Sequence, residues 1–404
     1  MNSTVRTLSQ KTQEFEPAST DDIRERAKAM VSVAAEHAEA VDRDARFPQE
    51  AYAVARSERL LGMQVPVEFG GQGASVADVV DVCYMLGQAC ASTAMIFAMH
   101  SIMVAILVRH ARASAWHQGF MRQIAAEQLL VASSTTEGLG GGDLRSSSCF
   151  VDPRGSQISF SKDATVMSYG ADADALLTTA RRSADSAPSD QVLVALLKKD
   201  YRLDPIVGWD VMGMRGTCST GFKVTGSGVP DQVLPVPYDQ IHKHSMMPIA
   251  HLTWSAAWSG AAAGAVGRAR QFVRNAARHG NGQLPPGAAH LTRAVMSLRA
   301  LRAQVASSLR RFEEAGTRAE ILESLDFQTA LTLHKVNASE MSIETVMNAL
   351  RATGLAGYRE EGEFSVSRSL RDVLSSSIMI NNDRILANAS SAAMLVDVPP
   401  FLRD

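Results

Sequence analysis

Residues 129–148 read LLVASSTTEGLGGGDLRSSS, and in this stretch the chain changes from a helical to a strand pattern. From about residue 20 to residue 130, apolar residues recur every three or four positions, which is typical of helices. Short β-branched runs follow as far as about residue 237, among them ATVMSYG at 164–170, and Gly, Pro and Ser separate them. Such runs indicate strands. From residue 247 the helical pattern returns, so the order predicts an α+β multidomain fold.

The last part of the chain is predicted to form an antiparallel helix bundle. It holds four long helical segments: TWSAAWSGAAAGAVGRARQFVRNAARHG, HLTRAVMSLRALRAQVASSLRRFEEAG, LDFQTALTLHKVNASEMSIETVMNALRATG and DRILANASSAAMLV. Small residues in the first of these allow close contact between helices. We therefore predict three domains: a helical one at 1–130, a β domain at 131–240 and the bundle at 241–404.

Composition excludes several classes of protein. The chain has 40 Lys and Arg against 42 Asp and Glu, so it lacks the basic surface that nucleic-acid binding needs. No apolar run reaches the roughly 18 residues of a membrane span, and the N-terminus lacks the apolar region of a signal peptide. The four cysteines form no CxxC pair, which argues against a metal site and suits a reducing compartment. We expect a cytoplasmic protein with no membrane or nucleic-acid partner.

Local motifs alone leave the function open. The glycines of 134–148 let the backbone approach an anion or a flat ring, but neither a P-loop nor a GxGxxG fingerprint is present, so a simple loop is favoured. Trp254 and Trp258 share one helix face, either as a packing pair or as the wall of a pocket. His100 lies in an apolar helix, where a hydrogen-bonded core histidine is the simpler interpretation. No GxSxG or HExxH signature occurs.

Taken together, the motifs resemble those of the acyl-CoA dehydrogenase superfamily. VPVEFGGQGAS at 65–75 is similar to its glycine-rich connector, and TEGLGGGD at 136–143 is similar to its TEPxxGSD loop. GWDVMGMRGTCST at 208–220 resembles its MGMRGT loop, and SLRDVLSSSIMINND at 369–383 resembles its closing Arg-Asp segment. These pieces occur in the family's order over most of the chain.

The resemblance implies an N-terminal α-helical domain, a middle β-barrel and a C-terminal four-helix bundle, with a flavin between barrel and bundle. The flavin is FAD, or FMN as the alternative. The family pattern places Thr135, Thr136, Gly141 and Gly142 at one edge of the flavin ring. It places Met167 and Ser168 at the N5 side of the ring. Homodimers or homotetramers are usual for such bundles.

The chain departs from the family at the catalytic base. A dehydrogenase of this family needs a carboxylate to remove the α-proton of a thioester. Counting from the Arg-Asp pair, the usual position of that carboxylate falls at Ile380, and the alternative position falls at Ala257. Neither side chain accepts a proton. Asp383 remains as a base that would need a different geometry.

A second departure concerns the tail of the cofactor. The family's Arg-x-x-Phe-Gly motif corresponds here to QLPPG at 283–287, with Arg278 nearby but out of register. The family's closing Gly-Gly pair reads Gly354-Leu355. Both changes argue against permanently bound FAD, and FMN or a loosely bound reduced flavin becomes credible.

Both departures favour the monooxygenases of this superfamily, which receive reduced flavin from a separate reductase and use it to activate O2. We predict a flavin-dependent monooxygenase that oxygenates a small, aromatic, indole-like substrate. The alternatives are an acyl-CoA or acyl-carrier-protein thioester dehydrogenase with a relocated base, and a catalytically silent scaffold. The catalytic candidates are Ser168, His100 and Asn382. The candidates for substrate contact are Trp254, Trp258, Ile380 and Tyr358, and no metal is expected.

Overall fold

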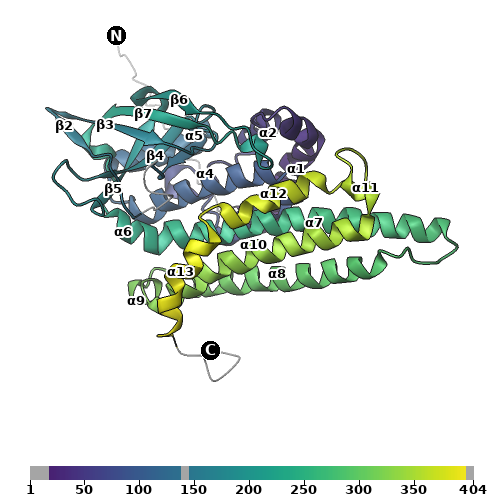
Figure 1. Ribbon diagram of the computed structural model, residues 1–404. Coiled ribbons are helices and arrows are strands. Elements are labelled where there is room, and N and C mark those ends of the chain that lie inside the picture. Colours follow the sequence, from purple (N-terminus) through teal and green to yellow (C-terminus); the bar gives the residue numbers. More distant parts are fainter. Residues whose placement is uncertain (1–17, 138–144, 397–404) are drawn as a thin grey trace, which may run out of the picture.

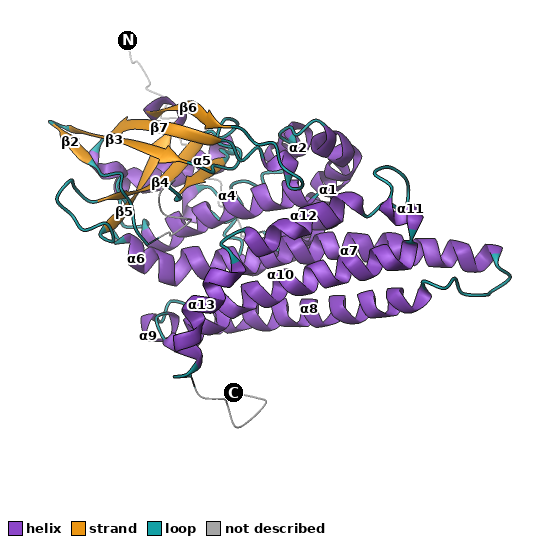
Figure 2. Cartoon of the chain, viewed as in Figure 1, coloured by secondary structure: helices purple, strands orange, loops and turns teal. Residues whose placement is uncertain are grey.

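The computed structural model describes residues 18–137 and 145–396. N-terminal helices are followed by a β-rich middle part and by long C-terminal helices, as Figure 1 shows. The strands gather at one end of the molecule, and the long helices run past them (Figure 2). The predicted fold class is confirmed, with the strands of the middle part divided between two sheets.

The N-terminal helices are α1 (Thr20–Arg43), α2 (Gln49–Ser57), α3 (Val76–Ala89), α4 (Ala91–His110) and α5 (Ala115–Glu127). Each of α1 and α3 begins at a serine whose side chain accepts a backbone N–H, and at α3 the Asp78 carboxylate completes a capping box. Helix α4 is apolar and long enough to cross a membrane, but 89% of its apolar window is buried inside the protein. It is therefore the central helix of the core.

The strands form a three-stranded sheet in the order β1-β4-β5 and a four-stranded sheet in the order β2-β3-β7-β6. Strand β1 pairs in parallel with β4, and the other neighbours are antiparallel. Their bounds are β1 (Val131–Ser134), β2 (Asp152–Arg154), β3 (Gln157–Ala164), β4 (Ala175–Arg181), β5 (Gln191–Leu197), β6 (Tyr201–Val207) and β7 (Gly221–Gly228). Strands β4 and β5 are buried along nearly their whole length, so this sheet lies inside the molecule.

The prediction of a strand at 164–170 is wrong, because the chain turns there instead. Tyr169 has a left-handed φ of +44°, and its N–H donates to the carbonyl of Thr217 at 2.8 Å. The N–H of Met167 donates to the carbonyl of Thr220 at 3.1 Å. The segment is thus tied to the loop before β7 by single hydrogen bonds, and this turn brings Ser168 to the surface of a cavity.

The C-terminal bundle contains α7 (Met247–His279), α8 (Ala288–Ala315) and α10 (Leu325–Thr353), which lie side by side. Its fourth position is divided between α12 (Ser367–Ile378) and α13 (Asn382–Ala393), which both pack on α10. The short helices are α6 (Tyr238–Ile241), α9 (Ala319–Leu322) and α11 (Leu355–Tyr358). A side chain on Gly87 of α3 would lie 2.3 Å from the carbonyl of Ala257, so glycine is what lets α3 touch α7.

A buried lysine holds the junction between α12 and α13. The Lys335 ammonium donates to the carbonyl of Ser376 at 2.9 Å and to Asn382 Oδ1 at 2.7 Å. Asn382 Nδ2 in turn donates to Ser339 Oγ at 2.8 Å. Burial lowers the pKa of Lys335 to about 8. This network fixes the link at 379–381, where Ile380 adopts a left-handed φ of +51°.

Candidate functional site

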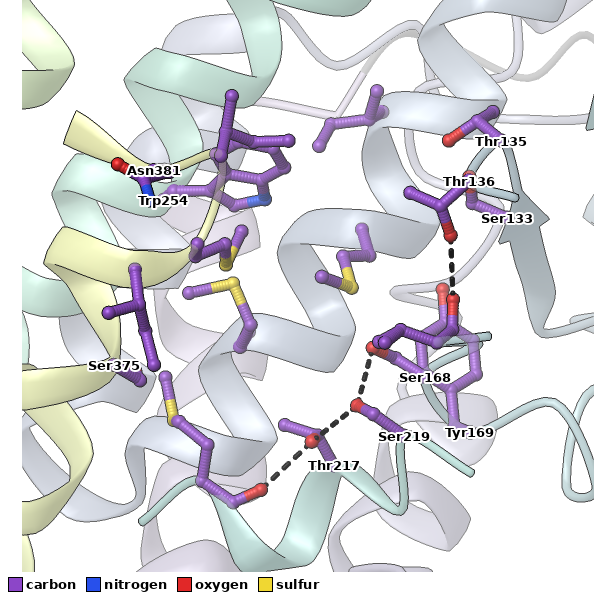
Figure 3. A pocket seen from close by; sticks show the side chains of 18 of the residues that line it. Ser133, Thr135, Thr136, Ser168, Tyr169, Thr217, Ser219, Trp254, Ser375 and Asn381 are labelled. Carbon is purple, nitrogen blue, oxygen red and sulfur yellow. Dashed lines mark hydrogen bonds between the residues drawn. The ribbon is translucent and has the colours of Figure 1, made fainter. Parts of the chain in front are cut away.

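A cavity of about 470 Å³ lies where α4, the end of β1, the loop at 208–220, α7 and the α12–α13 link meet (Figure 3). Its size falls within the roughly 300–1,000 Å³ that is typical of small-molecule sites. The lining residues are Met95, Met99, Ile102, Met103, Ser133, Thr135, Thr136, Val166, Ser168, Tyr169, Trp209, Met214, Thr217, Ser219, Met246, Trp254, Ser375, Ile378, Met379, Ile380, Asn381 and Arg384.

Apolar side chains dominate this cavity. Six methionines line it, and methionine fills irregular space with a flexible, polarizable side chain. Among its described lining residues there is no Asp, Glu, His, Lys or Cys. The cavity wall in residues 18–137 and 145–396 therefore offers no carboxylate that could act as a general base.

Hydroxyl groups line one side of the cavity. Thr135 and Thr136 follow β1, and Thr136 Oγ1 donates to the carbonyl of Val166 at 3.1 Å. Ser168 Oγ lies 2.8 Å from Ser219 Oγ, which lies 2.8 Å from Thr217 Oγ1, as the dashed lines of Figure 3 show. This side of the cavity can therefore make several hydrogen bonds to a bound ring.

A fully buried lysine supports the hydroxyl side from behind. The Lys162 ammonium donates to the carbonyls of Ser134 and Thr179 at 3.0 and 2.9 Å, and it lies 3.5 Å from a carboxylate oxygen of Glu137. Glu137 also accepts hydrogen bonds from the hydroxyls of Ser147 and Ser148. Burial opposes ionisation of Glu137, but these hydroxyls and Lys162 leave its pKa below the usual value. The contacts connect β1 to residues on both sides of the glycine segment.

Trp254 of α7 stands across the cavity from Thr135 and Thr136 in Figure 3. Its side chain is nearly buried, with 6% exposed, and its Nε1 has no hydrogen-bond partner among the residues that the structure describes. A buried N–H without a partner costs free energy, and a ligand that supplies an acceptor removes this cost. Trp254 therefore offers both an apolar face and a free donor to a bound molecule.

His100 does not reach the cavity, so the sequence-based suggestion of a catalytic role is not retained. Its Nδ1 accepts the N–H of Val131 at 3.0 Å, so its Nε2 carries the proton and donates to the carbonyl of Leu61 at 2.8 Å. Burial lowers the pKa of His100 to about 4. His100 is a neutral core residue that joins α4 to β1.

Other suggested residues also lie outside the cavity. Trp258 is fully buried one turn beyond Trp254, and Met167 is fully buried beside Gly170. Asn382 is engaged with Lys335 in the network behind the wall, and its neighbour Asn381 takes the lining position. Tyr358 is 71% exposed at the far end of the bundle.

Five of the residues that the sequence suggested for the site come together in the cavity: Thr135, Thr136, Ser168, Trp254 and Ile380. Gly141 and Gly142 lie outside the described residues. Neither alternative base position reaches the cavity, because Ala257 is buried against α3 and Asp383 is exposed in the first turn of α13.

Sequence reasoning missed several lining residues. Met95, Met99 and Met103 are four residues apart on α4, so their spacing could have shown that they share one face. Ser219 and Trp209 belong to the 208–220 loop, where no local signal distinguishes a lining residue from an exposed one.

Asp372 anchors the loop that carries Met214 to the cavity. The N–H of Met214 donates to Asp372 Oδ1 at 2.6 Å. Burial is the largest influence and raises the pKa of Asp372 from 3.8 to about 6, although this N–H and the nearby arginines act in the other direction. Folding therefore favours the neutral acid relative to the unfolded chain, and the carboxylate predominates in the folded protein only above about pH 6. The contribution of Asp372 to the stability of the fold is fully present below pH 3.8, and it is lost as the pH rises through about 6.

The replacement Asp372→Asn should remove this pH dependence while it keeps an oxygen acceptor for Met214. From pH 5 to pH 8, we expect the wild type to lose roughly 1 to 1.5 kcal/mol of unfolding free energy relative to the variant. Urea denaturation of both proteins at each pH measures the difference. Asp210→Asn, on the exposed part of the same loop, is the control. A difference that stays constant with pH would contradict the titration of Asp372.

The sequence matches that of known proteins at both ends of the chain. Residues 17–129 match the N-terminal domain of acyl-CoA dehydrogenases, and residues 245–395 match their C-terminal domain. A cyclohex-1-ene-1-carbonyl-CoA dehydrogenase from Geobacter metallireducens is 24% identical over 363 residues, which are 88% of this chain and 92% of the relative.

Several solved structures share the fold, and TdsC and MsuC are two of them. The dibenzothiophene monooxygenase TdsC from Paenibacillus sp. A11-2, in complex with FMN and indole, has a TM-score of 0.78 at 20% identity. The match covers 94% of this chain and 98% of TdsC. The methanesulfinate monooxygenase MsuC from Pseudomonas fluorescens has a TM-score of 0.77 at 20% identity over 95% of this chain and 98% of its own. At these identities the likeness concerns the fold alone.

The two domain matches together span more than half of the sequence, and the chain therefore belongs to the acyl-CoA dehydrogenase family of flavin-dependent oxidoreductases.

Proposed function

We propose that this chain is a monooxygenase that uses reduced flavin and O2 to oxygenate a small, apolar, aromatic substrate of the indole type. The observation that carries the proposal is the absence of any carboxylate among the described residues that line the cavity. A dehydrogenase must remove an α-proton and needs such a base, whereas an oxygenation does not. The side chain at the expected base position, Ile380, is part of the apolar wall.

The residues around the cavity fit a flavin. A flavin ring is flat and apolar on its faces, with nitrogen and oxygen atoms along its edges. The hydroxyls of Thr135, Thr136 and Ser168 lie on one side of the cavity, and the unpartnered N–H of Trp254 lies across from them. We propose that these hydroxyls hold the flavin, as either FMN or FAD. When bound, the flavin supplies the electron transfer and oxygen chemistry.

The residues of the chain itself bind, orient and exclude water. The methionines, Ile380 and Trp254 make a largely dry space, and in such a space hydrogen bonds and charges act more strongly than in water. The indole of Trp254 can stack on an aromatic ring, and its N–H can donate to an acceptor atom of the substrate. Indole bound to TdsC is consistent with an aromatic substrate for this chain.

The alternative is a thioester dehydrogenase with a relocated base. The Geobacter relative, a CoA-thioester dehydrogenase, favours it. Asp383 would have to move from its exposed place at the start of α13, and the wall that it would enter is fixed by Lys335. We therefore rank the dehydrogenase second.

The proposal includes partners. The chain would receive reduced flavin from a separate reductase and would assemble as a homodimer or homotetramer through its helix bundle. A cytoplasmic location agrees with four cysteines that are all free.

The function can be tested by single turnover. Protein is mixed anaerobically with chemically reduced FMN and a panel of indole-type substrates, then exposed to ¹⁸O2, and products are analysed by mass spectrometry. We expect one labelled oxygen atom in the product. Oxidised flavin that is instead bleached by an acyl-CoA under anaerobic conditions, with no labelled product, would establish the dehydrogenase.

Trp254→Ala should weaken the binding of an aromatic substrate by about 10- to 100-fold, because it removes the stacking face and the free donor. The flavin, held by hydroxyls across the cavity, should lose much less affinity. Titration of the flavin-loaded protein with substrate, and of the free protein with flavin, separates the two effects. Trp116→Ala on α5, whose ring does not line the cavity, is the control. An equal loss of both affinities would make Trp254 a packing residue.

A further inference from the structure

The hydroxyl groups beside the cavity form a chain of hydrogen bonds with only one possible direction. Thr217 Oγ1 lies 2.8 Å from the carbonyl oxygen of Met214, and because a carbonyl only accepts, Thr217 donates its proton there. Each hydroxyl has a single proton to donate. Ser219 must therefore donate to Thr217, and Ser168 must donate to Ser219, each across 2.8 Å. Ser168 is left with lone pairs, and not a proton, for a ligand.

Neighbouring hydroxyls of the same wall are committed in the same way. Thr136 donates to the carbonyl of Val166 at 3.1 Å, and Tyr169 donates to the carbonyl of Val131 at 2.9 Å. Thr217 and Ser219 are only 3% and 4% exposed, so water has little access to reverse the chain. This part of the wall is thus a set of hydrogen-bond acceptors.

We propose that the relay Thr217–Ser219–Ser168 makes the site selective for reduced over oxidised flavin. This inference rests on the proposed function. Reduced flavin has an N–H at N5, whereas oxidised flavin has a lone pair at the same atom. The family pattern places Ser168 at the N5 side of the ring, and an acceptor there would attract the first and repel the second. Ser219 and Thr217 are then positioning residues, because they act on the flavin only through the direction of the Ser168 proton.

The selectivity suits a protein that exchanges its flavin with a reductase. The site would take up reduced flavin from solution and would hold oxidised flavin less tightly, so that the oxidised form could leave after turnover. The relay thus gives a second reason to expect a cofactor that exchanges freely. The first reason is that QLPPG at 283–287 replaces the family's Arg-x-x-Phe-Gly motif, which binds the tail of the cofactor.

The test compares dissociation constants for oxidised FMN and for dithionite-reduced FMN under anaerobic conditions, followed by fluorescence. We expect wild type to bind reduced FMN at least about tenfold more tightly, which is the worth of about one hydrogen bond. Thr217→Val and Ser219→Ala each release the Ser168 proton toward the cavity, so the ratio should fall about tenfold. Thr217→Ser keeps the relay and should keep the ratio. For a two-electron couple, a tenfold change appears as a shift of about 30 mV in the bound flavin's midpoint potential.

Thr353→Val is the matched control, because its buried hydroxyl donates to carbonyls of its own helix and does not face the cavity. Its ratio should equal that of the wild type. If Thr217→Val and Ser219→Ala bind both forms with the wild-type ratio, or if the wild type itself shows no preference, the relay inference is overturned while the proposed function stands. If the wild type binds neither form, the proposed function fails and the inference fails with it.

Discussion

Replacement of Lys162 by methionine is expected to lower the free energy of unfolding by about 3 to 5 kcal/mol. The Lys162 ammonium is fully buried and donates to two backbone carbonyls and to Thr179 Oγ1 at 2.8 Å. Methionine has a similar length but no donor, so each of these oxygens would lose a hydrogen bond, with only that from Thr178 Oγ1 left to the Ser134 carbonyl, and the Glu137 carboxylate would lose its counterion. Buried polar groups without partners are among the most destabilising defects in proteins. Urea denaturation measures the loss.

The effect should extend to the cavity, because Lys162 holds the end of β1 just before Thr135 and Thr136. We expect the folded fraction of Lys162→Met to bind flavin more weakly than the wild type does. Lys198→Met is the matched control, since the exposed Lys198 donates to only one carbonyl, that of Ala171. Its cost should stay below about 1 kcal/mol. Equal losses in the two variants would show that Lys162 is no more important than a surface lysine.

Replacement of Trp258 by alanine is expected to cost about 3 to 5 kcal/mol of stability, because it empties a large volume in a closely packed core. Trp258 is fully buried in α7, and the ammonium of Lys335 lies 5.8 Å from the centre of its ring. Loss of the ring would also loosen the lysine that holds the α12–α13 link. Thermal and chemical denaturation should both report the change.

Substrate affinity separates Trp258 from Trp254. Since Trp258 does not line the cavity, the folded fraction of Trp258→Ala should bind substrate within about threefold of the wild type, whereas Trp254→Ala should not. Trp258→Phe, which keeps most of the volume, should recover more than half of the stability. A large loss of affinity in Trp258→Phe with normal stability would instead place Trp258 at the substrate.

The helices were well predicted, because their apolar periodicity is a local property of the sequence. Helix α4 is the clearest case: its buried character follows from an apolar run around a single histidine. Strand β6 carries only a weak strand signal, because apolar and polar residues alternate no further than Asp204, Pro205 then interrupts the run, and much of the strand is exposed. The turn at 164–170 looked like a strand because its side chains are β-branched and aromatic, but its backbone pairs with a distant loop.

The candidate site was predicted only in part. The resemblance to a family indicated Thr135, Thr136 and Ser168, which the structure brings to one cavity wall. It gave no guide to Ser219 and Thr217, which lie about fifty residues further along the chain. The folded loop brings Ser219 to Ser168 and Thr217 to Ser219. For His100, the sequence showed a histidine in an apolar helix, but only its contacts with Leu61 and Val131 show that both ring nitrogens are occupied.

By itself the sequence determined the order of helices, strands and helices and the apolar identity of Ile380 and Ala257, because periodicity and residue identity are read along the chain. Only the tertiary structure decided which side chains share the cavity. One turn of α7 separates Trp254 in the wall from Trp258 in the core, and one residue separates Asn381 in the wall from Asn382 in the Lys335 network. Such choices depend on where distant elements pack, and a local pattern carries no information about that packing.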